Sequence, residues 1–154
     1  MEFKHKVRTC LFLPSAEEAA NFYVSIIPNS QIDNIVKPDP NGPALVVEFM
    51  LAGLPMMTMS GNSQLESSHM HSISILTKDQ SETDQLWDAL LENGGEEGRC
   101  GWLKDRFGVH WQIVPQQLPQ LMSSSNPEQG QRVQAALMTM MKIDIEALQA
   151  AAQQ

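Results

Sequence analysis

The sequence predicts an α+β fold made of two tandem β-α-β-β-β modules followed by C-terminal helices. Two helical segments share one spacing of apolar residues, and both begin and end at matching positions, Ser15 with Asp79 and Asn29 with Asn93. A strand-like run precedes each helix, and three such runs follow it. After Pro115 the composition shifts toward Gln, Ala and Met, which is typical of helices. Together these observations indicate an internal duplication with a helical extension.

The first module is expected over residues 5–61. Residues 7–13 are strand-like, and the sequence SAEE that follows fits a capping box in which Ser15 accepts from a backbone N–H group. Apolar residues then recur at i, i+3, i+4, i+7 and i+8, the pattern of a helix with one buried face, until Asn29 ends it. Three further strand-like runs complete this module: 31–36, 44–51 and 54–60.

The second module is expected over residues 70–115, after a Ser-rich linker at 62–69. A strand-like run at 71–77 leads to the sequence DQSE, where Asp79 fits the same capping box. The apolar residues of this helix repeat the offsets of the first one, and Asn93 precedes two glycines that end it. Three strand-like runs follow again: 95–100, 101–105 and 109–114.

The extension, 116–154, is expected to be helical. Asn126 followed by Pro127 is typical of a helix start, and we expect that helix to run to about Lys142. Asp144 then starts a second, shorter helix. The methionines of this region could offer a ligand surface, but filling an irregular core or a dimer interface is the favoured interpretation. These methionines are Met138, Met140 and Met141.

Composition limits the classes of function. The 154 residues suit one domain, and the formal net charge of −8 argues against nucleic acid, whose binding needs a positive face. The chain shows neither a signal-type apolar run nor a stretch long enough to span a membrane. Cys10 and Cys100 form no C-x-x-C pair and are interpreted as reduced thiols. We therefore expect a cytoplasmic protein.

Five segments carry a resemblance to a known family: SAEEAANFYVSIIPNSQI, VVEFMLAGLPM, TDQLWDALLENGGEE, CGWLKDRFGVHWQIVP and KIDIEAL. They resemble the PhnB-like branch of the vicinal oxygen chelate superfamily, which includes glyoxalases and bleomycin-resistance proteins. This branch carries the legacy label 3-demethylubiquinone-9 3-methyltransferase. The resemblance implies a glyoxalase-like fold in which two modules form a half-open barrel around a cavity, and it implies a homodimer.

The resemblance also identifies where metal-using members of the superfamily hold their ion. These positions fall on Arg8, on Ser72 (or on His71 if the alignment shifts by one residue), on Gln112 and near Thr58. Arginine stays protonated and repels a cation, whereas zinc, nickel and iron prefer imidazole, thiolate and carboxylate ligands. We therefore predict that this chain uses neither a metal nor another cofactor.

Strand alternation in VHWQIV places His110 and Gln112 on the cavity face and Trp111 and Ile113 in the core. His110 is either a general base or, as we favour, a hydrogen-bonding part of the wall. The predicted ligand pocket comprises Arg8, Cys10, Phe12, Glu48, Ser72, Trp102, His110 and Gln112.

Five of the pocket residues have an expected role. Arg8 would pair with an anionic group of the ligand, and Gln112 with His110 would orient it by hydrogen bonds. Phe12 and Trp102 would supply an apolar wall. Two residues keep two interpretations each: Cys10 is an inert thiol or, less favoured, a reactive one, and Glu48 either faces the cavity or is exposed at an edge.

The expected function is binding of a small, partly apolar molecule, and whether catalysis occurs stays open. The first alternative is a metal-dependent lyase or dioxygenase in which His71 and Glu48 hold the ion. A second is an interaction protein whose Met-rich helices bind a partner chain. The least favoured is a ubiquinone-type methyltransferase, because the glycine pair Gly94–Gly95 follows a helix, whereas a cofactor loop leads from a strand into one.

Overall fold

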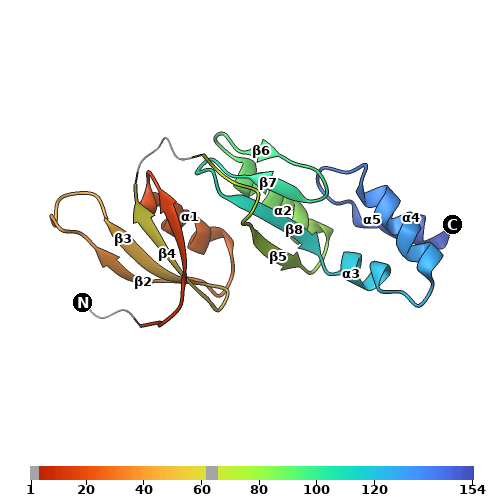
Figure 1. Cartoon of the computed structure of the whole chain (residues 1–154), viewed down its shortest axis with the longest axis horizontal. Helices are drawn as coiled ribbons and strands as arrows, with labels where there is room; N and C mark the ends of the chain where they lie inside the picture. Colours follow the sequence, from red (N-terminus) through yellow and green to blue (C-terminus); the bar gives the residue numbers. More distant parts are fainter. Residues whose placement is uncertain (1–3, 62–65) are drawn as a thin grey trace. The chain divides into compact units, whose positions relative to one another are not determined.

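Strands and helices up to Pro115 follow one another in the order that the sequence predicts, as the computed structural model of residues 4–61 and 66–154 shows (Figure 1). One short helix that the sequence did not predict then precedes the two expected helices of the extension. The chain divides after Glu66 into two compact units. We call the residues up to Glu66 unit 1 and Ser67–Gln154 unit 2, and describe each by itself. The predicted linker, 62–69, lies partly outside the described residues.

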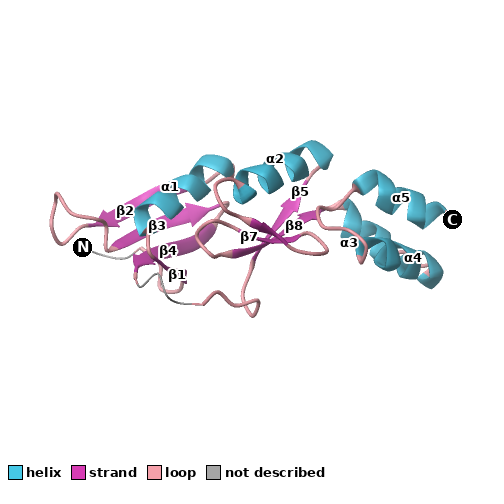
Figure 2. Ribbon diagram, turned by 90° about the horizontal axis from the view of Figure 1, so that it is seen from above, coloured by secondary structure: helices cyan, strands magenta, loops and turns pink. Residues whose placement is uncertain are grey.

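Unit 1 holds the first β-α-β-β-β module. Its elements are β1 (Thr9–Leu13), α1 (Ala16–Ile26), β2 (Gln31–Val36), β3 (Val46–Leu51) and β4 (Leu54–Ser60). The strands form a sheet in the order β1-β4-β3-β2, with β1 parallel to β4 and the other pairs antiparallel. Helix α1 covers one face of this sheet (Figure 2). Tyr23 and Phe49 are fully buried in this unit and fill its core.

Unit 2 repeats this arrangement. Its module consists of β5 (Ile73–Thr77), α2 (Gln80–Leu91), β6 (Glu96–Glu97), β7 (Trp102–Lys104) and β8 (His110–Pro115). The sheet order is β5-β8-β7-β6, the same as in unit 1, and α2 covers one face of it (Figure 2). Trp111 and Ile113 are fully buried under this helix, as strand alternation predicts. The predicted duplication is therefore confirmed at the level of topology.

The extension adds three helices to unit 2: α3 (Gln117–Met122), α4 (Pro127–Leu137) and α5 (Ile145–Gln153). They enclose a core cluster of Leu118, Val133, Ile143 and Leu148. Met140 packs against this cluster, whereas Met138 and Met141 are 55% and 43% exposed. Of the three methionines, only Met140 therefore fills the core of this unit.

Three of the four predicted helix caps form side-chain bonds. Asp79, Asn126 and Asp144 each accept a hydrogen bond from a backbone N–H group in the first turn of their helix. The prediction for Ser15 is wrong, because its side chain makes no capping bond. At the other ends, Asn29 and Asn93 adopt φ values of 58° and 61°, the left-handed conformation expected of a helix stop.

Helix α4 ends at Leu137, five residues before the predicted end near Lys142. The backbone first tightens, because Thr139 and Met140 donate to carbonyl groups only three residues earlier. The carbonyl groups of Met140 and Met141 then accept from the N–H groups of Cys100 and Gly101. These long-range bonds replace the helical ones that would have continued α4.

Candidate functional site

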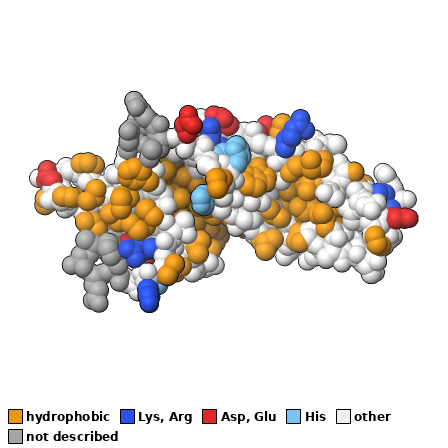
Figure 3. All heavy atoms as spheres, viewed as in Figure 1, with side chains coloured by type: hydrophobic (Ala, Val, Ile, Leu, Met, Phe, Trp, Pro, Cys, Tyr) orange, Lys and Arg blue, Asp and Glu red, His pale blue; other side chains and the backbone are white. Residues whose placement is uncertain are grey.

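The open face of the sheet in unit 1, opposite α1, carries the four predicted pocket residues of this unit. The strand register aligns Cys10 with Met57 and Met57 with Glu48, so these three side chains share one face. By alternation Arg8 and Phe12 lie on the same face as Cys10. Figure 3 shows hydrophobic side chains gathered over the strands of this unit, and Phe12 is 47% exposed.

Arg8 and Glu48 form an ion pair on this face. The Nε atom of Arg8 lies 3.3 Å from Oε1 of Glu48, and the two side chains are 18% and 6% exposed. The guanidinium also donates to Sδ of Met57 at 3.2 Å and to the carbonyl oxygen of His5 at 2.7 Å. Both oxygens of Glu48 are buried without a hydrogen-bond partner among the described residues. Glu48 is therefore a buried carboxylate held by one cation and is not exposed at an edge.

Cys10 is an ordinary thiol in this setting. Partial burial raises the pKa of Cys10 above its usual value, and the nearby positive charge of Arg8 offsets only part of that rise. A raised pKa lowers the thiolate fraction at neutral pH, and the thiolate is the reactive form. The geometry supports the inert interpretation of this residue.

In unit 2 the open sheet face carries Ser72, Trp102, His110 and Gln112. Gln112 donates from Nε2 to Oγ of Ser72 at 2.8 Å. Gln112 also aligns with Trp102 on the neighbouring strand β7, so the two side chains share a face. A neutral amide and a hydroxyl thus occupy two positions that the superfamily resemblance assigns to metal ligands.

The internal repeat corrects the last of the four positions that the resemblance assigns to metal ligands. In unit 2, Gln112 aligns with Ser74 on β5. The counterpart of Ser74 in unit 1 is Cys10, which aligns with Met57, so Met57 is the counterpart of Gln112. The predicted residue, Thr58, points the other way: it is fully buried and donates to the carbonyl oxygen of Ala16 at 2.8 Å. A shift of one residue in a strand moves a side chain to the opposite face, and that explains the error.

These four side chains do not fit a divalent metal ion. Arg8 is a cation paired with Glu48, Met57 offers a soft thioether, and Ser72 is already bonded to Gln112. Zinc, iron, nickel and manganese sites are built from imidazole, carboxylate or thiolate groups. Among the residues that the structure describes, no group of three or more His, Cys, Asp and Glu side chains is placed to hold a metal ion.

A cavity of about 290 Å³ lies in unit 2, beside the open sheet face that carries Trp102 and His110. It is lined by Ser67, His69, Glu96, Glu97, Gly98, Trp102, Leu103, Lys104 and His110. The rings of His69 and His110 lie 4.1 Å apart between centroids, and His69 also faces Trp102 at 6.2 Å. His110 hydrogen-bonds Oγ of Ser67 at 3.2 Å. Two predicted pocket residues, Trp102 and His110, therefore line one cavity.

The surroundings of His110 favour its neutral form. Burial lowers the pKa of His110 below its usual value, and the neighbouring His69 and Lys104 lower it further, while Asp105 and Glu96 offset part of that change. A neutral imidazole has one donor and one acceptor, so it can orient an uncharged polar group. The ammonium of Lys104 is itself paired with Glu96 at 3.0 Å.

Sequence reasoning missed two residues of this region. His69 lies two residues before His71, the histidine that the sequence analysis considered as a metal ligand and that the structure places in an exposed position. Asp105 is 1% exposed and accepts from the backbone of Phe107 and Val109 and from Nε1 of Trp111. An aspartate before a turn glycine is the available signal for such a role.

The family described as 3-demethylubiquinone-9 3-methyltransferase matches residues 5–114. The chain belongs to this family. Among solved structures it is similar to the PhnB protein from Bacillus cereus, at 29% identity and a TM-score of 0.64 over 72% of this chain and 99% of that one. The resemblance to PhnB-like proteins of the vicinal oxygen chelate superfamily is thereby confirmed.

More distant structures show the same fold. Protein PA1353 from Pseudomonas aeruginosa is 19% identical with a TM-score of 0.59, covering 73% of this chain and 98% of that one. The fosfomycin resistance protein FosX from Mesorhizobium loti is 11% identical with a TM-score of 0.54, covering 73% and 92%. No curated protein matches the chain. In the described part of the chain, helices that could cross a membrane are absent.

Proposed function

We propose that this PhnB-like chain is a cytoplasmic, homodimeric protein that binds a small, partly apolar molecule against the open faces of its sheets without a metal. The observation that carries the proposal is the cavity beside Trp102 and His110. An aromatic wall with a few fixed polar groups is the usual composition of a small-molecule site.

The chemistry of this cavity favours an uncharged ligand with one polar group. His110 is neutral, and Lys104 is paired with Glu96 and therefore offers no free positive charge. Trp102 presents a flat apolar surface, and the ring of His69 lies 6.2 Å from it between centroids. On the open face of unit 1, Arg8 is engaged by Glu48, so an anionic group of a ligand would have to displace that carboxylate.

The family description does not by itself assign methyl transfer to this chain. The glycine pair Gly94–Gly95 lies between α2 and β6, which is the opposite order to a strand-to-helix cofactor loop. The alternative metal site of His71 and Glu48 has no added support, because Glu48 is buried against Arg8 and His71 is exposed. The binding proposal therefore stands first.

A screen of neutral aromatic fragments by ligand-observed NMR tests the proposal. Fragments that bind the wild-type chain are expected to bind Trp102→Ala and His110→Gln about tenfold more weakly, because stacking and an orienting hydrogen bond are lost. His71→Gln is the matched control, since it changes an exposed histidine outside the cavity, and it should bind as the wild type does. Equal binding by all three variants would place the fragments elsewhere and refute the assignment.

A further inference from the structure

A hydroxyl group and an imidazole meet in the cavity beside Trp102. Oγ of Ser67 lies 3.2 Å from Nε2 of His110, which is within the reach of a nucleophile and its general base. Both residues line the cavity. Ser67 is exposed, whereas only 6% of His110 is. A hydroxyl group that a small molecule can reach is thus bonded to a buried imidazole.

The imidazole is in the state that a general base requires. Its surroundings favour the neutral form, and in the tautomer with a proton on Nδ1, its Nε2 atom accepts from the hydroxyl group of Ser67. The ring of His69 packs 4.1 Å from the ring of His110 and limits its rotation. Asp105 and Glu96 act on the pKa of His110 in the upward direction, so they stabilise the imidazolium that forms when the proton is taken.

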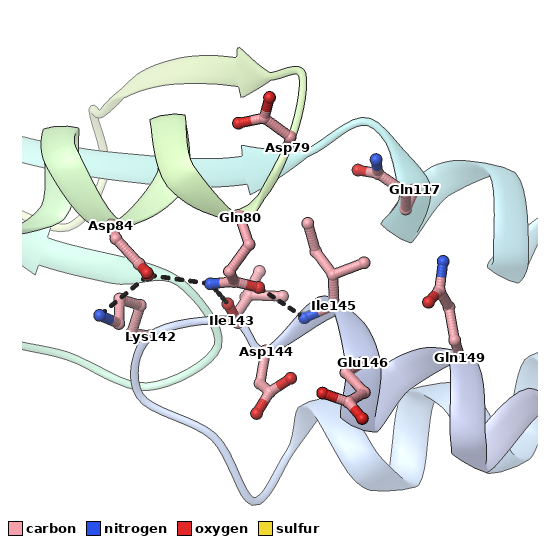
Figure 4. A pocket seen from close by; sticks show the side chains of 10 residues that line it. All are labelled: Asp79, Gln80, Asp84, Gln117, Lys142, Ile143, Asp144, Ile145, Glu146 and Gln149. Carbon is pink, nitrogen blue, oxygen red and sulfur yellow. Dashed lines mark hydrogen bonds and ion pairs between the residues drawn. The ribbon is translucent and has the colours of Figure 1, made fainter.

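The larger cleft of unit 2 offers no comparable pair. It has a volume of about 650 Å³ and lies between the starts of α2 and α3 and the segment leading into α5 (Figure 4). The described side chains that line it are carboxylates, amides, one ammonium and two isoleucines. At one end, the amide of Gln80 bonds to Asp84 and to the backbone of Ile143 and Ile145. Of these two sites, only the smaller cavity therefore brings a nucleophile to a base.

We propose that Ser67 and His110 hydrolyse aryl esters of small carboxylic acids, a proposal that rests on the binding function of the same cavity. The ester is uncharged, its ring lies against Trp102, and the volume of about 290 Å³ suits a short acyl group. Lys104 is paired with Glu96, so little positive charge is available to stabilise an oxyanion. Because a phenolate leaves more easily than an alkoxide, aryl esters need less of that stabilisation than alkyl esters.

The reaction has two steps. In the first, Oγ of Ser67 forms a bond to the carbonyl carbon while Nε2 of His110 takes the hydroxyl proton. The bond from that carbon to the aryl oxygen breaks, the leaving phenolate receives the proton, and the acyl group stays on Ser67. In the second step, water attacks the acyl carbon and gives a proton to Nε2. Oγ then leaves and regains that proton, which releases the carboxylic acid.

Two measurements on the full chain test this proposal. The first is hydrolysis of 4-nitrophenyl acetate, with the spontaneous rate subtracted. The second is binding of 4-nitroacetanilide, a stable amide of similar shape, by ligand-observed NMR. Ser67→Ala removes the nucleophile, and His110→Gln removes the base. Ser68→Ala is the matched control, because it removes the hydroxyl group of the next residue, which is exposed and accepts from the N–H group of Met70.

Ser67→Ala and His110→Gln should each lower the rate of ester hydrolysis at least about tenfold, and Ser68→Ala should leave it unchanged. Ser67→Ala should still bind the amide within about twofold of the wild type, because the aromatic wall is intact. That combination separates a nucleophile from a residue that only shapes the cavity.

Three results would overturn the proposal. Ester hydrolysis that Ser67→Ala retains would show that another group attacks the ester, and loss of both activities in that variant would give Ser67 a structural role. Amide binding by the wild type without ester hydrolysis would refute the catalytic step and leave the proposed binding function intact. If the wild type neither binds the amide nor hydrolyses the ester, the binding function fails for this class as well.

Discussion

Replacing Asp105 with alanine is expected to lower the free energy of unfolding of unit 2 by about 3–5 kcal/mol. The carboxylate is 1% exposed and serves the N–H groups of Phe107, Val109 and the Trp111 ring at 2.8–3.0 Å. Without it, these donors lose their partner inside the protein. The turn that starts β8 would loosen, and β8 carries His110 and Gln112.

Urea unfolding followed by tryptophan fluorescence measures this loss. All three tryptophans, Trp87, Trp102 and Trp111, belong to unit 2, so the signal reports that unit alone. Asp105→Asn keeps one acceptor and should cost less than alanine, whereas the exposed control Asp88→Ala should change stability by less than about 0.5 kcal/mol. A cost for Asp105→Ala no larger than that of the control would show that the turn does not depend on this carboxylate.

Replacing Arg8 with methionine is expected to destabilise unit 1 by about 2–4 kcal/mol, because it leaves the carboxylate of Glu48 buried without its cation. The Glu48 side chain is 6% exposed, so water cannot take over the role of the guanidinium. The double variant Arg8→Met with Glu48→Leu removes both charges. It should recover most of the loss, since a buried ion pair contributes little beyond what an apolar pair of similar size would.

Far-UV circular dichroism during urea unfolding is the suitable readout here, since unit 1 has no tryptophan. Lys37→Met is the matched control: it removes a cation from the ion pair of Lys37 with Glu17, whose side chains are 32% and 34% exposed. That more exposed pair should contribute less than about 1 kcal/mol. If Arg8→Met and Lys37→Met cost the same, Arg8 and Glu48 do not form a buried pair.

The module repeat was predictable because it depends on local signals. The spacing of apolar residues along a helix depends only on residues that are close together in the sequence. The same is true of the Asp79 cap and of the left-handed asparagines Asn29 and Asn93, and the structure has all of these features where expected. Strand alternation also placed Trp111 and Ile113 in the core, since they alternate with the polar residues His110 and Gln112 in VHWQIV.

The errors arose where local signals were absent or were overridden. In the run MMTM each face of the strand carries a methionine, so alternation could not tell Met57 from Thr58. The end of α4 depends on bonds from Cys100 and Gly101, far away in the sequence. The hydrogen bonds of Gln80 with Ile143 and Ile145 join residues equally far apart in the sequence, so they could not be predicted either.

This chain keeps the fold of the vicinal oxygen chelate superfamily, while its residues at the positions of the superfamily's metal ligands do not suit a metal. Elemental mass spectrometry on untagged protein, purified without chelators and then incubated with zinc, manganese, nickel or ferrous ions, tests it directly. We predict only substoichiometric metal after desalting, and no change in thermal stability on chelation. About one ion per chain, lost together with thermal stability on chelation, would contradict the claim and identify a binding site that Arg8, Met57, Ser72 and Gln112 do not explain.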